Sequence, residues 1–136
     1  METPRDDERT RVLIVDDHED TVELLAAALT SYGADVAVAT SVPEALDVLR
    51  RHRPHVLVSD LSMPGEDGFR LMHHIQSQQP VSPAPTAIAL TAHARAQDRE
   101  QALAAGFQMY LSKPIEPMRL GAVIAALVHG GDTVGG

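Results

Sequence analysis

The sequence predicts an α/β protein built around a mainly parallel sheet, and this prediction depends on three observations. Five short apolar runs alternate with five longer amphipathic stretches along the chain. The runs are apolar at consecutive positions, as expected of strands that helices cover on both faces. At 136 residues, the chain can bury one core but not two. Because parallel crossovers are right-handed, five strand–helix units in one domain place helices on both faces of the sheet.

The first two strand–helix units are defined by their apolar runs and by the residues at the helix ends. The first strand covers 12–15, and the helix after it covers 18–31 with Gly33 as its C-terminal cap. The second strand covers 36–39. The next helix begins at 41–44, where a serine followed three residues later by a glutamate forms a capping box with proline in the first turn.

The remaining units follow the same pattern, with Asp67 and Gly106 as predicted caps at the start of one helix and the end of another. Three further strands are predicted over 55–60, 86–91 and 107–112, and a helix follows each of them. The last helix carries an apolar stripe of Leu120, Ile124 and Leu127. These bounds predict a domain over 11–129, a flexible N-terminal tail over 1–10 and a flexible C-terminal tail over 130–136.

The composition argues against several classes of protein. The chain has no cysteine, which excludes disulfides, thiolate catalysis and cysteine-based zinc sites. Its net charge of −8 argues against binding to nucleic acid, because phosphate backbones need a basic surface. No apolar run approaches the roughly 20 residues of a membrane span, and the N-terminus lacks the apolar core of a signal peptide. We therefore expect a cytoplasmic protein with no membrane contact.

Polar side chains follow four of the five predicted strands. Asp16 and Asp17 come after the first strand, Asp60 ends the third, Thr91 ends the fourth and Lys113 follows the fifth. In an open parallel sheet, the crevice beyond the carboxyl ends of the strands is where ligands bind. Lys113 is also the only lysine among eleven basic residues, which suggests a place where a planar guanidinium does not fit.

Three carboxylates at one sheet edge indicate a cation site. Two like charges about 4 Å apart repel by roughly 1 kcal/mol in water and by about 4 kcal/mol at an effective dielectric of 20. Such a cluster favours a hard divalent cation, with Mg²⁺ expected and Mn²⁺ as the alternative. Thr91 could then donate a hydrogen bond to a phosphoryl oxygen while Lys113 neutralises another. These are the requirements of phosphoryl transfer, which depends on positioning and charge neutralisation.

Four segments at these strand ends resemble the receiver domains of response regulators in two-component signalling. They are Asp16-Asp17, the block 60–68, Leu90-Thr91-Ala92 and Lys113-Pro114, in that order and spacing. Each segment alone is a weak signal, but all four at strand ends are specific. The resemblance covers about residues 11–129. It implies a flavodoxin-like (βα)5 fold, a doubly wound parallel sheet with strand order 2-1-3-4-5, which periodicity alone does not predict.

The resemblance also assigns roles to individual residues. Asp60 is the expected phosphoryl acceptor. The expected metal ligands are Asp16, Asp17, Asp60 and the backbone carbonyl of Ser62. The expected phosphate-binding residues are Thr91, Ala92 and Lys113. The remaining implied roles are a switch formed by Thr91 and Tyr110, tuning of the phosphoryl lifetime by Ser62 and His93, and a cis peptide between Lys113 and Pro114.

The function that the resemblance implies is a phosphorylation switch or relay and not an enzyme, apart from slow reactions on its own phosphoryl group. The donor is a sensor histidine kinase or a histidine phosphotransfer protein, and the downstream partner is an unknown protein. The partner is expected to bind the face formed by the fourth helix, the fifth strand and the fifth helix. Candidate residues for that face are Arg95, Arg99, Tyr110 and Met118.

Three alternatives stay open. A phosphatase of the haloacid-dehalogenase type needs a second aspartate two residues after the acceptor, where Ser62 stands. A degenerate receiver that only binds partners should have lost one of the three acids or Lys113, but the three acids and Lys113 are all present. The segments 104–107 and 113–117 resemble receivers fused to hybrid sensor kinases, although Met1 and the glycine-rich end favour a complete chain.

A glutamate in the loop after the acceptor and most of the histidines are not explained by the resemblance. Glu66 replaces an apolar residue that is common in the loop after the acceptor, and it adds negative charge near the site. Most of the seven histidines are interpreted as solvated surface residues, among them the adjacent pair His73 and His74.

Overall fold

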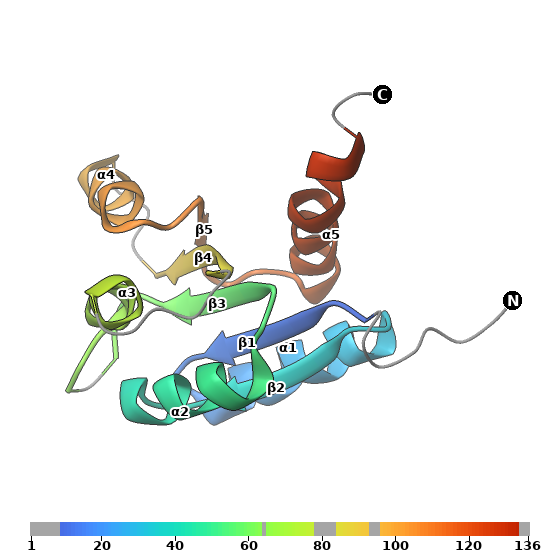
Figure 1. The fold of residues 1–136 in the computed structure, drawn as a ribbon, viewed down its shortest axis with the longest axis horizontal. Helices are drawn as coiled ribbons and strands as arrows, with labels where there is room; N and C mark the ends of the chain where they lie inside the picture. Colours follow the sequence, from blue (N-terminus) through green and yellow to red (C-terminus); the bar gives the residue numbers. More distant parts are fainter. Residues whose placement is uncertain (1–8, 64, 78–83, 93–95, 134–136) are drawn as a thin grey trace, which may run out of the picture.

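The computed structural model describes residues 9–63, 65–77, 84–92 and 96–133. Five strands alternate with five helices along the chain (Figure 1). The strands are β1 (Arg11–Val15), β2 (Asp35–Ala39), β3 (Val56–Asp60), β4 (Thr86–Thr91) and β5 (Met109–Ser112). The helices are α1 (Glu19–Ser31), α2 (Val42–His52), α3 (Gly68–Ser77), α4 (Ala96–Ala105) and α5 (Pro117–Thr133).

The strands form one sheet in the order β2-β1-β3-β4-β5, and every neighbouring pair is parallel. The predicted α/β class and the strand order implied by the resemblance are therefore confirmed. The order reverses at β1, which lies between β2 and β3. A reversal of this kind opens a crevice at the carboxyl ends of the two central strands. That crevice lies directly beyond Val15 and Asp60.

Alternate residues of the inner strands β1, β3 and β4 bury their side chains on opposite faces of the sheet. On one face, Leu13 and Leu57 lie in a core cluster with residues of α2, α3 and α4. On the other face, Ile14 and Val58 lie in a cluster with residues of α1 and α5. All four of these side chains are fully buried. This two-faced burial explains why the strands are apolar at consecutive positions, and truncating one such Leu to Ala costs about 2–5 kcal/mol.

The predicted helix caps are present in the structure, with one change of partner. Ser41 Oγ accepts a hydrogen bond from the Glu44 N–H at 3.3 Å, as a capping box requires. The Glu44 carboxylate accepts instead from the N–H of Thr40, one residue before the cap, at 2.6 Å. Asp67 Oδ1 accepts from the Arg70 N–H at 2.9 Å and caps α3.

The fifth strand begins later than predicted, at Met109 instead of residue 107. Phe107 is buried in the core, and its N–H donates to the Ala102 carbonyl at the end of α4. The side-chain oxygen of Gln108 accepts a hydrogen bond from the Ala87 N–H at 2.7 Å, in the place of a backbone carbonyl of the strand. Its own N–H donates to the Ala87 carbonyl at 2.8 Å. A side chain thus completes the pairing that the sequence pattern attributes to the strand.

The last helix runs to Thr133, four residues past the predicted domain end at 129. Residues 1–8, 78–83 and 134–136 lie outside the described residues, so the predicted tails are described only in part. The bounds of the domain stay a prediction. Across the described residues, no helix is both long enough and apolar enough to cross a membrane.

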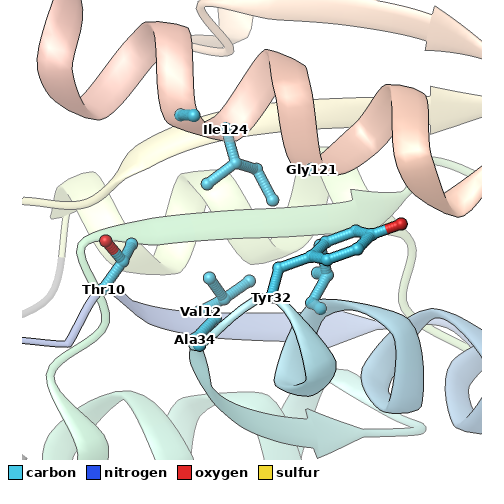
Figure 2. A pocket seen from close by; sticks show the side chains of 9 residues that line it. Thr10, Val12, Tyr32, Ala34, Gly121 and Ile124 are labelled. Carbon is cyan, nitrogen blue, oxygen red and sulfur yellow. The ribbon is translucent and has the colours of Figure 1, made fainter. Parts of the chain in front are cut away.

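A small cavity of about 170 Å³ lies between α1 and α5, away from the acidic edge. It is lined by residues from the starts of β1 and β2 and from the two helices, among them Thr10, Ala34 and Ile124. Figure 2 shows the Tyr32 ring beside Gly121 of α5. A Cβ on Gly121 would lie 2.9 Å from the ring carbon Cδ2 of Tyr32, so the glycine lets the ring pack against the helix.

Candidate functional site

The candidate site lies at the carboxyl edge of the sheet, where the register of parallel strands brings the acids together. Val15 of β1 pairs with Ser59 of β3, so the next residue of each strand, Asp16 and Asp60, reaches the edge at the same level. Ligand atoms of Asp16, Asp17, His18 and Asp60 all lie within 4.8 Å of one another. The structure therefore brings together the three acids that the sequence places at strand ends.

Asp16 is fully buried and makes several polar contacts. Its Oδ1 accepts hydrogen bonds from the His18 N–H at 3.0 Å and contacts His18 Nδ1 at 3.0 Å. Its Oδ2 lies 2.7 Å from Lys113 Nζ. Burial alone would raise the pKa of the Asp16 carboxyl, but the Lys113 ammonium and the two His18 groups hold this pKa below its ordinary value. Asp16 is therefore expected to stay negatively charged in the folded protein.

Asp60 is also buried, with only 3% of the residue exposed, but its balance of interactions differs. Its Oδ1 accepts from the Ser62 N–H at 3.1 Å, and its Oδ2 lies 3.1 Å from Lys113 Nζ. Burial raises the pKa of Asp60 above its ordinary value, and the charge of Asp16 adds to this rise. The Ser62 N–H and Lys113 offset only part of it.

Lys113 joins the two buried acids, because its ammonium lies within ion-pair distance of both. Burial on its own would lower the pKa of Lys113. Hydrogen bonding and attraction by Asp16 and Asp60 raise this pKa above the ordinary value, so the group stays charged. The Lys113–Pro114 peptide bond is cis.

Asp17 supplies the feature that best fits a metal ion. The residue is partly exposed, but its Oδ1 is buried and has no hydrogen-bond partner among the described residues. A buried carboxylate oxygen without a partner is costly unless a cation satisfies it. Carboxylate and carbonyl oxygens are the ligands that Mg²⁺ prefers, and the three acids with the nearby Ser62 backbone offer such a set. The residues at this edge therefore fit a divalent cation.

The candidate phosphate-binding residues lie at the ends of the neighbouring strands. Thr91 ends β4 and is buried, whereas Ala92 directly after it is exposed. Thr91 pairs with Ser112 of β5, and its carbonyl accepts a hydrogen bond from the Lys113 N–H at 2.7 Å. The two residues that carry the hydroxyl and ammonium groups are thus joined by a backbone hydrogen bond. His93 lies outside the described residues.

The candidate switch and output residues are spread over β5, α4 and α5. Tyr110 of β5 is half-buried and packs against the core cluster under α2, α3 and α4. Arg99 of α4 is exposed, and Met118 at the start of α5 is 71% exposed. Arg95 lies outside the described residues. Single exposed apolar side chains are common on protein surfaces, so Met118 stays a candidate for the predicted output face.

The negative charge of Glu66 is compensated by α3. The Glu66 carboxylate lies 2.9 Å from His74 Nε2 and 3.3 Å from Arg70 Nε. The His74 hydrogen bond holds the pKa of Glu66 below its ordinary value. His74 is 16% exposed and is therefore an exception to the expected surface histidines.

Gly68 lets the start of α3 lie directly against the acceptor strand. A Cβ on this residue would lie 2.5 Å from the backbone oxygen of Asp60 and 3.1 Å from the Cα of Leu61. Backbone atoms cannot move aside as a flexible side chain can. The glycine that ends the 60–68 block therefore has a packing role that the sequence pattern did not identify.

His18 is the site residue that sequence reasoning missed. It precedes α1, and its Nδ1 lies 3.0 Å from Asp16 Oδ1 and 3.4 Å from Asp17 Oδ1. The available signal was its position directly after the two aspartates. These two carboxylates raise the pKa of the His18 imidazole, with the Asp16 hydrogen bond as the largest cause.

Comparison with known proteins identifies the family of the chain. The family model described as the response regulator receiver domain matches residues 12–125. The chain is 47% identical over 109 residues to an uncharacterized 14.6 kDa protein of Leptolyngbya boryana, covering 80% of this chain and 82% of that protein. It is 34% identical over 110 residues to the sensor histidine kinase RcsC of Escherichia coli, covering 81% of this chain but only 11% of RcsC.

A solved structure agrees with the fold. The CheY-like response regulator receiver domain protein from Methanospirillum hungatei superposes with a TM-score of 0.81 at 23% identity, covering 91% of this chain and 97% of that one. At this identity the likeness concerns the fold alone. The match of the family model across most of the described residues carries the assignment. The chain therefore belongs to the response regulator receiver domain family.

Proposed function

We propose that this chain accepts a phosphoryl group on Asp60 in a Mg²⁺-dependent reaction and then presents a changed α4–β5–α5 face to a partner. The observation that carries the proposal is the Lys113 ammonium, 2.7 Å from Asp16 and 3.1 Å from Asp60 at the carboxyl edge of the sheet. A buried acceptor lies beside the Lys113 ammonium, and the neighbouring Asp17 Oδ1 has no hydrogen-bond partner within the part of the chain that the structure describes. This arrangement fits phosphoryl transfer.

The proposed reaction forms one bond and breaks one. An Asp60 carboxylate oxygen attacks the phosphorus of a phosphohistidine, and the phosphorus–nitrogen bond breaks as the oxygen–phosphorus bond forms. The electron pair of that bond stays on the histidine nitrogen, which takes up a proton from water, so the histidine leaves as neutral imidazole. Bound Mg²⁺ would neutralise negative charge on the carboxylates and on the phosphoryl oxygens. The residues that would hold it are Asp17, Asp60 and the Ser62 carbonyl, with Asp16 in support.

After transfer, the chain's own groups are expected to bind the new phosphoryl oxygens. Lys113 can turn from the Asp60 carboxylate to a phosphoryl oxygen while it keeps Asp16 as a partner. The Thr91 hydroxyl and the Ala92 N–H, at the end of β4, are the expected donors to these oxygens. Because Thr91 is hydrogen-bonded to the backbone of Lys113, a shift of Thr91 acts on the end of β5. This supports a switch that includes Tyr110.

The proposed donor is a histidine kinase or a histidine phosphotransfer protein, and the downstream partner is a protein that binds α4, β5 and α5. The relationship to a segment of RcsC, a sensor histidine kinase, favours a relay as one setting. Ser62 stands where a haloacid-dehalogenase phosphatase needs an aspartate, so turnover of outside substrates is not proposed. We further propose that the chain acts in the cytoplasm and binds no nucleic acid.

The proposal is tested by labelling the chain with acetyl phosphate in the presence of Mg²⁺. The intact mass should increase by one phosphoryl group, and Asp60→Asn should abolish the increase. Asp47→Asn is the matched control, because Asp47 is an exposed aspartate that forms an ion pair with Arg51 on the surface of α2. EDTA should prevent labelling of both the parent and the control. Undiminished labelling of Asp60→Asn would show that the acceptor is elsewhere.

A further inference from the structure

We propose that His18 is a nitrogen ligand of the metal site and shifts its preference from Mg²⁺ toward divalent transition metals that bind imidazole, such as Co²⁺ or Zn²⁺. The inference rests on the proposed function for the carboxylates of the same site. Imidazole suits Co²⁺, Ni²⁺ and Zn²⁺, whereas sites built only of carboxylate, carbonyl and water suit Mg²⁺ and Mn²⁺. One histidine in the set therefore changes which ion is bound.

The separations between the ligand atoms are those of neighbours around one ion. His18 Nδ1 lies 3.0 Å from Asp16 Oδ1 and 3.4 Å from Asp17 Oδ1. With metal–ligand bonds of about 2.1 Å, adjacent octahedral ligands lie about 3 Å apart and opposite ligands about 4.2 Å apart. The four ligand atoms, including one from Asp60, lie within 4.8 Å of one another. Small side-chain rotations therefore suffice to place all four on one ion.

The His18 side chain is available for this role. It is 66% exposed, and it makes no capping hydrogen bond to α1, so the helix does not depend on its orientation. The His18 backbone N–H donates to Asp16 Oδ1, and the imidazole Nδ1 lies 3.0 Å from the same oxygen. The buried Oδ1 of Asp17 has no hydrogen-bond partner among the described residues, and it lies 3.4 Å from the same nitrogen. A cation bound here would satisfy the Asp17 oxygen, and His18 Nδ1 would exchange its contact with Asp16 for a bond to the metal.

The simplest competing explanation is that His18 only provides positive charge near the acids. The two explanations predict different results for substitution of His18. If His18 acts as a counter-charge, removing it strengthens the binding of every divalent cation by the same factor. If His18 is a ligand, removing it weakens Co²⁺ binding and leaves Mg²⁺ binding nearly unchanged or stronger. The ratio of the two dissociation constants therefore separates a ligand from a charge.

His18→Asn is the decisive variant, because the amide oxygen of Asn takes nearly the same place as Nδ1 and replaces nitrogen by oxygen. Asn is also a favoured N-cap residue, so α1 is expected to form as before. His73→Asn is the matched control, since His73 is an exposed histidine of α3. Dissociation constants of the full chain for Co²⁺ and Mg²⁺ are measured by calorimetry at one fixed pH. The visible absorption of bound Co²⁺ gives a second readout.

The parent and His73→Asn should show the same preference for Co²⁺ over Mg²⁺. Loss of even an outer-shell partner typically costs about 10–100-fold in metal affinity, so His18→Asn should lower this preference by at least about tenfold. The Co²⁺ spectrum should change in the same variant only. An unchanged preference in His18→Asn would overturn the role of His18 while the proposed function stands. A parent that binds neither ion would overturn both.

Discussion

Replacing the acceptor carboxylate should stabilise the metal-free protein, although it removes the reacting group. Asp60 is buried beside two other acids, and its raised pKa means that the folded protein disfavours its charged form. Asp60→Asn removes that charge and keeps an oxygen that can accept the Ser62 N–H. Lys113 is not left unpaired, because Asp16 stays 2.7 Å from its ammonium.

The size of the effect follows from the distances. The ligand atoms of the cluster lie at most 4.8 Å apart. At that distance, two carboxylates repel by about 3.5 kcal/mol at an effective dielectric of 20. Asp60 therefore experiences about 7 kcal/mol of repulsion from Asp16 and Asp17 together. The Lys113 ammonium at 3.1 Å returns about 5 kcal/mol of attraction. The difference, before the cost of burial is added, predicts a gain of about 1–2 kcal/mol in unfolding free energy for Asp60→Asn.

The assay is thermal and urea unfolding of the parent and Asp60→Asn in EDTA, at one fixed pH. The variant should melt higher, by about 3–6 °C for each kcal/mol in a domain of this size. Mg²⁺ at about one hundred times its dissociation constant should stabilise the parent by about 2.7 kcal/mol and the variant by much less. Asp47→Asn, on the surface, should change stability by less than about 0.5 kcal/mol. A metal-free Asp60→Asn that melts below the parent would refute the argument from crowded charge.

Three further predictions concern coupling, packing and pH. Thr91→Ala should still accept a phosphoryl group but should no longer shift the amide signals around Tyr110; couplings of this kind are typically about 1–3 kcal/mol. Gly68→Ala should cost about 1–3 kcal/mol of stability in urea unfolding, because its Cβ meets backbone at 2.5 Å. Because the pKa of Glu66 is lowered in the folded protein, its carboxylate stabilises the fold at pH values above its ordinary pKa. This stabilisation is lost as the pH falls through the pKa that Glu66 has in the folded protein. His74→Asn should raise the Glu66 pKa in an NMR titration, and an unmoved pKa would exclude His74 as its cause.

The convergence of the acids could be predicted from sequence because it follows from a rule of parallel sheets. Four of the five apolar runs are followed by polar candidate site residues, and the ends of parallel strands meet at one edge whatever the details of packing. The order of the strands could not be predicted from periodicity, since the spacing of apolar residues does not indicate which strands are neighbours. It required the resemblance to receiver domains. The start of β5 was missed because the Gln108 side chain takes over one rung of the ladder, a contact that no period reveals.

The role of His18 and the compensation of the Glu66 charge were not predicted, for the same physical reason. His18 and Glu66 have roles that depend on where a side chain turns, and this depends on partners that sequence spacing does not identify. Glu66 reaches His74, eight residues away on α3, so its charge is compensated there. His18 turns back to Asp16 instead of capping the helix that follows it. Both residues lie in loops next to the site, where the backbone path sets the direction of a side chain.

The opposite pKa directions of the two buried acids suggest how the proposed reaction is favoured. Asp16, with a lowered pKa, stays an anion and keeps Lys113 in place. Asp60, with a raised pKa, carries a charge that the folded protein disfavours. When Asp60 becomes an acyl phosphate, the carboxylate charge is lost and the phosphoryl oxygens bring up to two negative charges to the same edge. Lys113 and a divalent cation would have to bind these charges, so a cation that relieves the crowding of the metal-free protein would also favour the proposed phosphorylation.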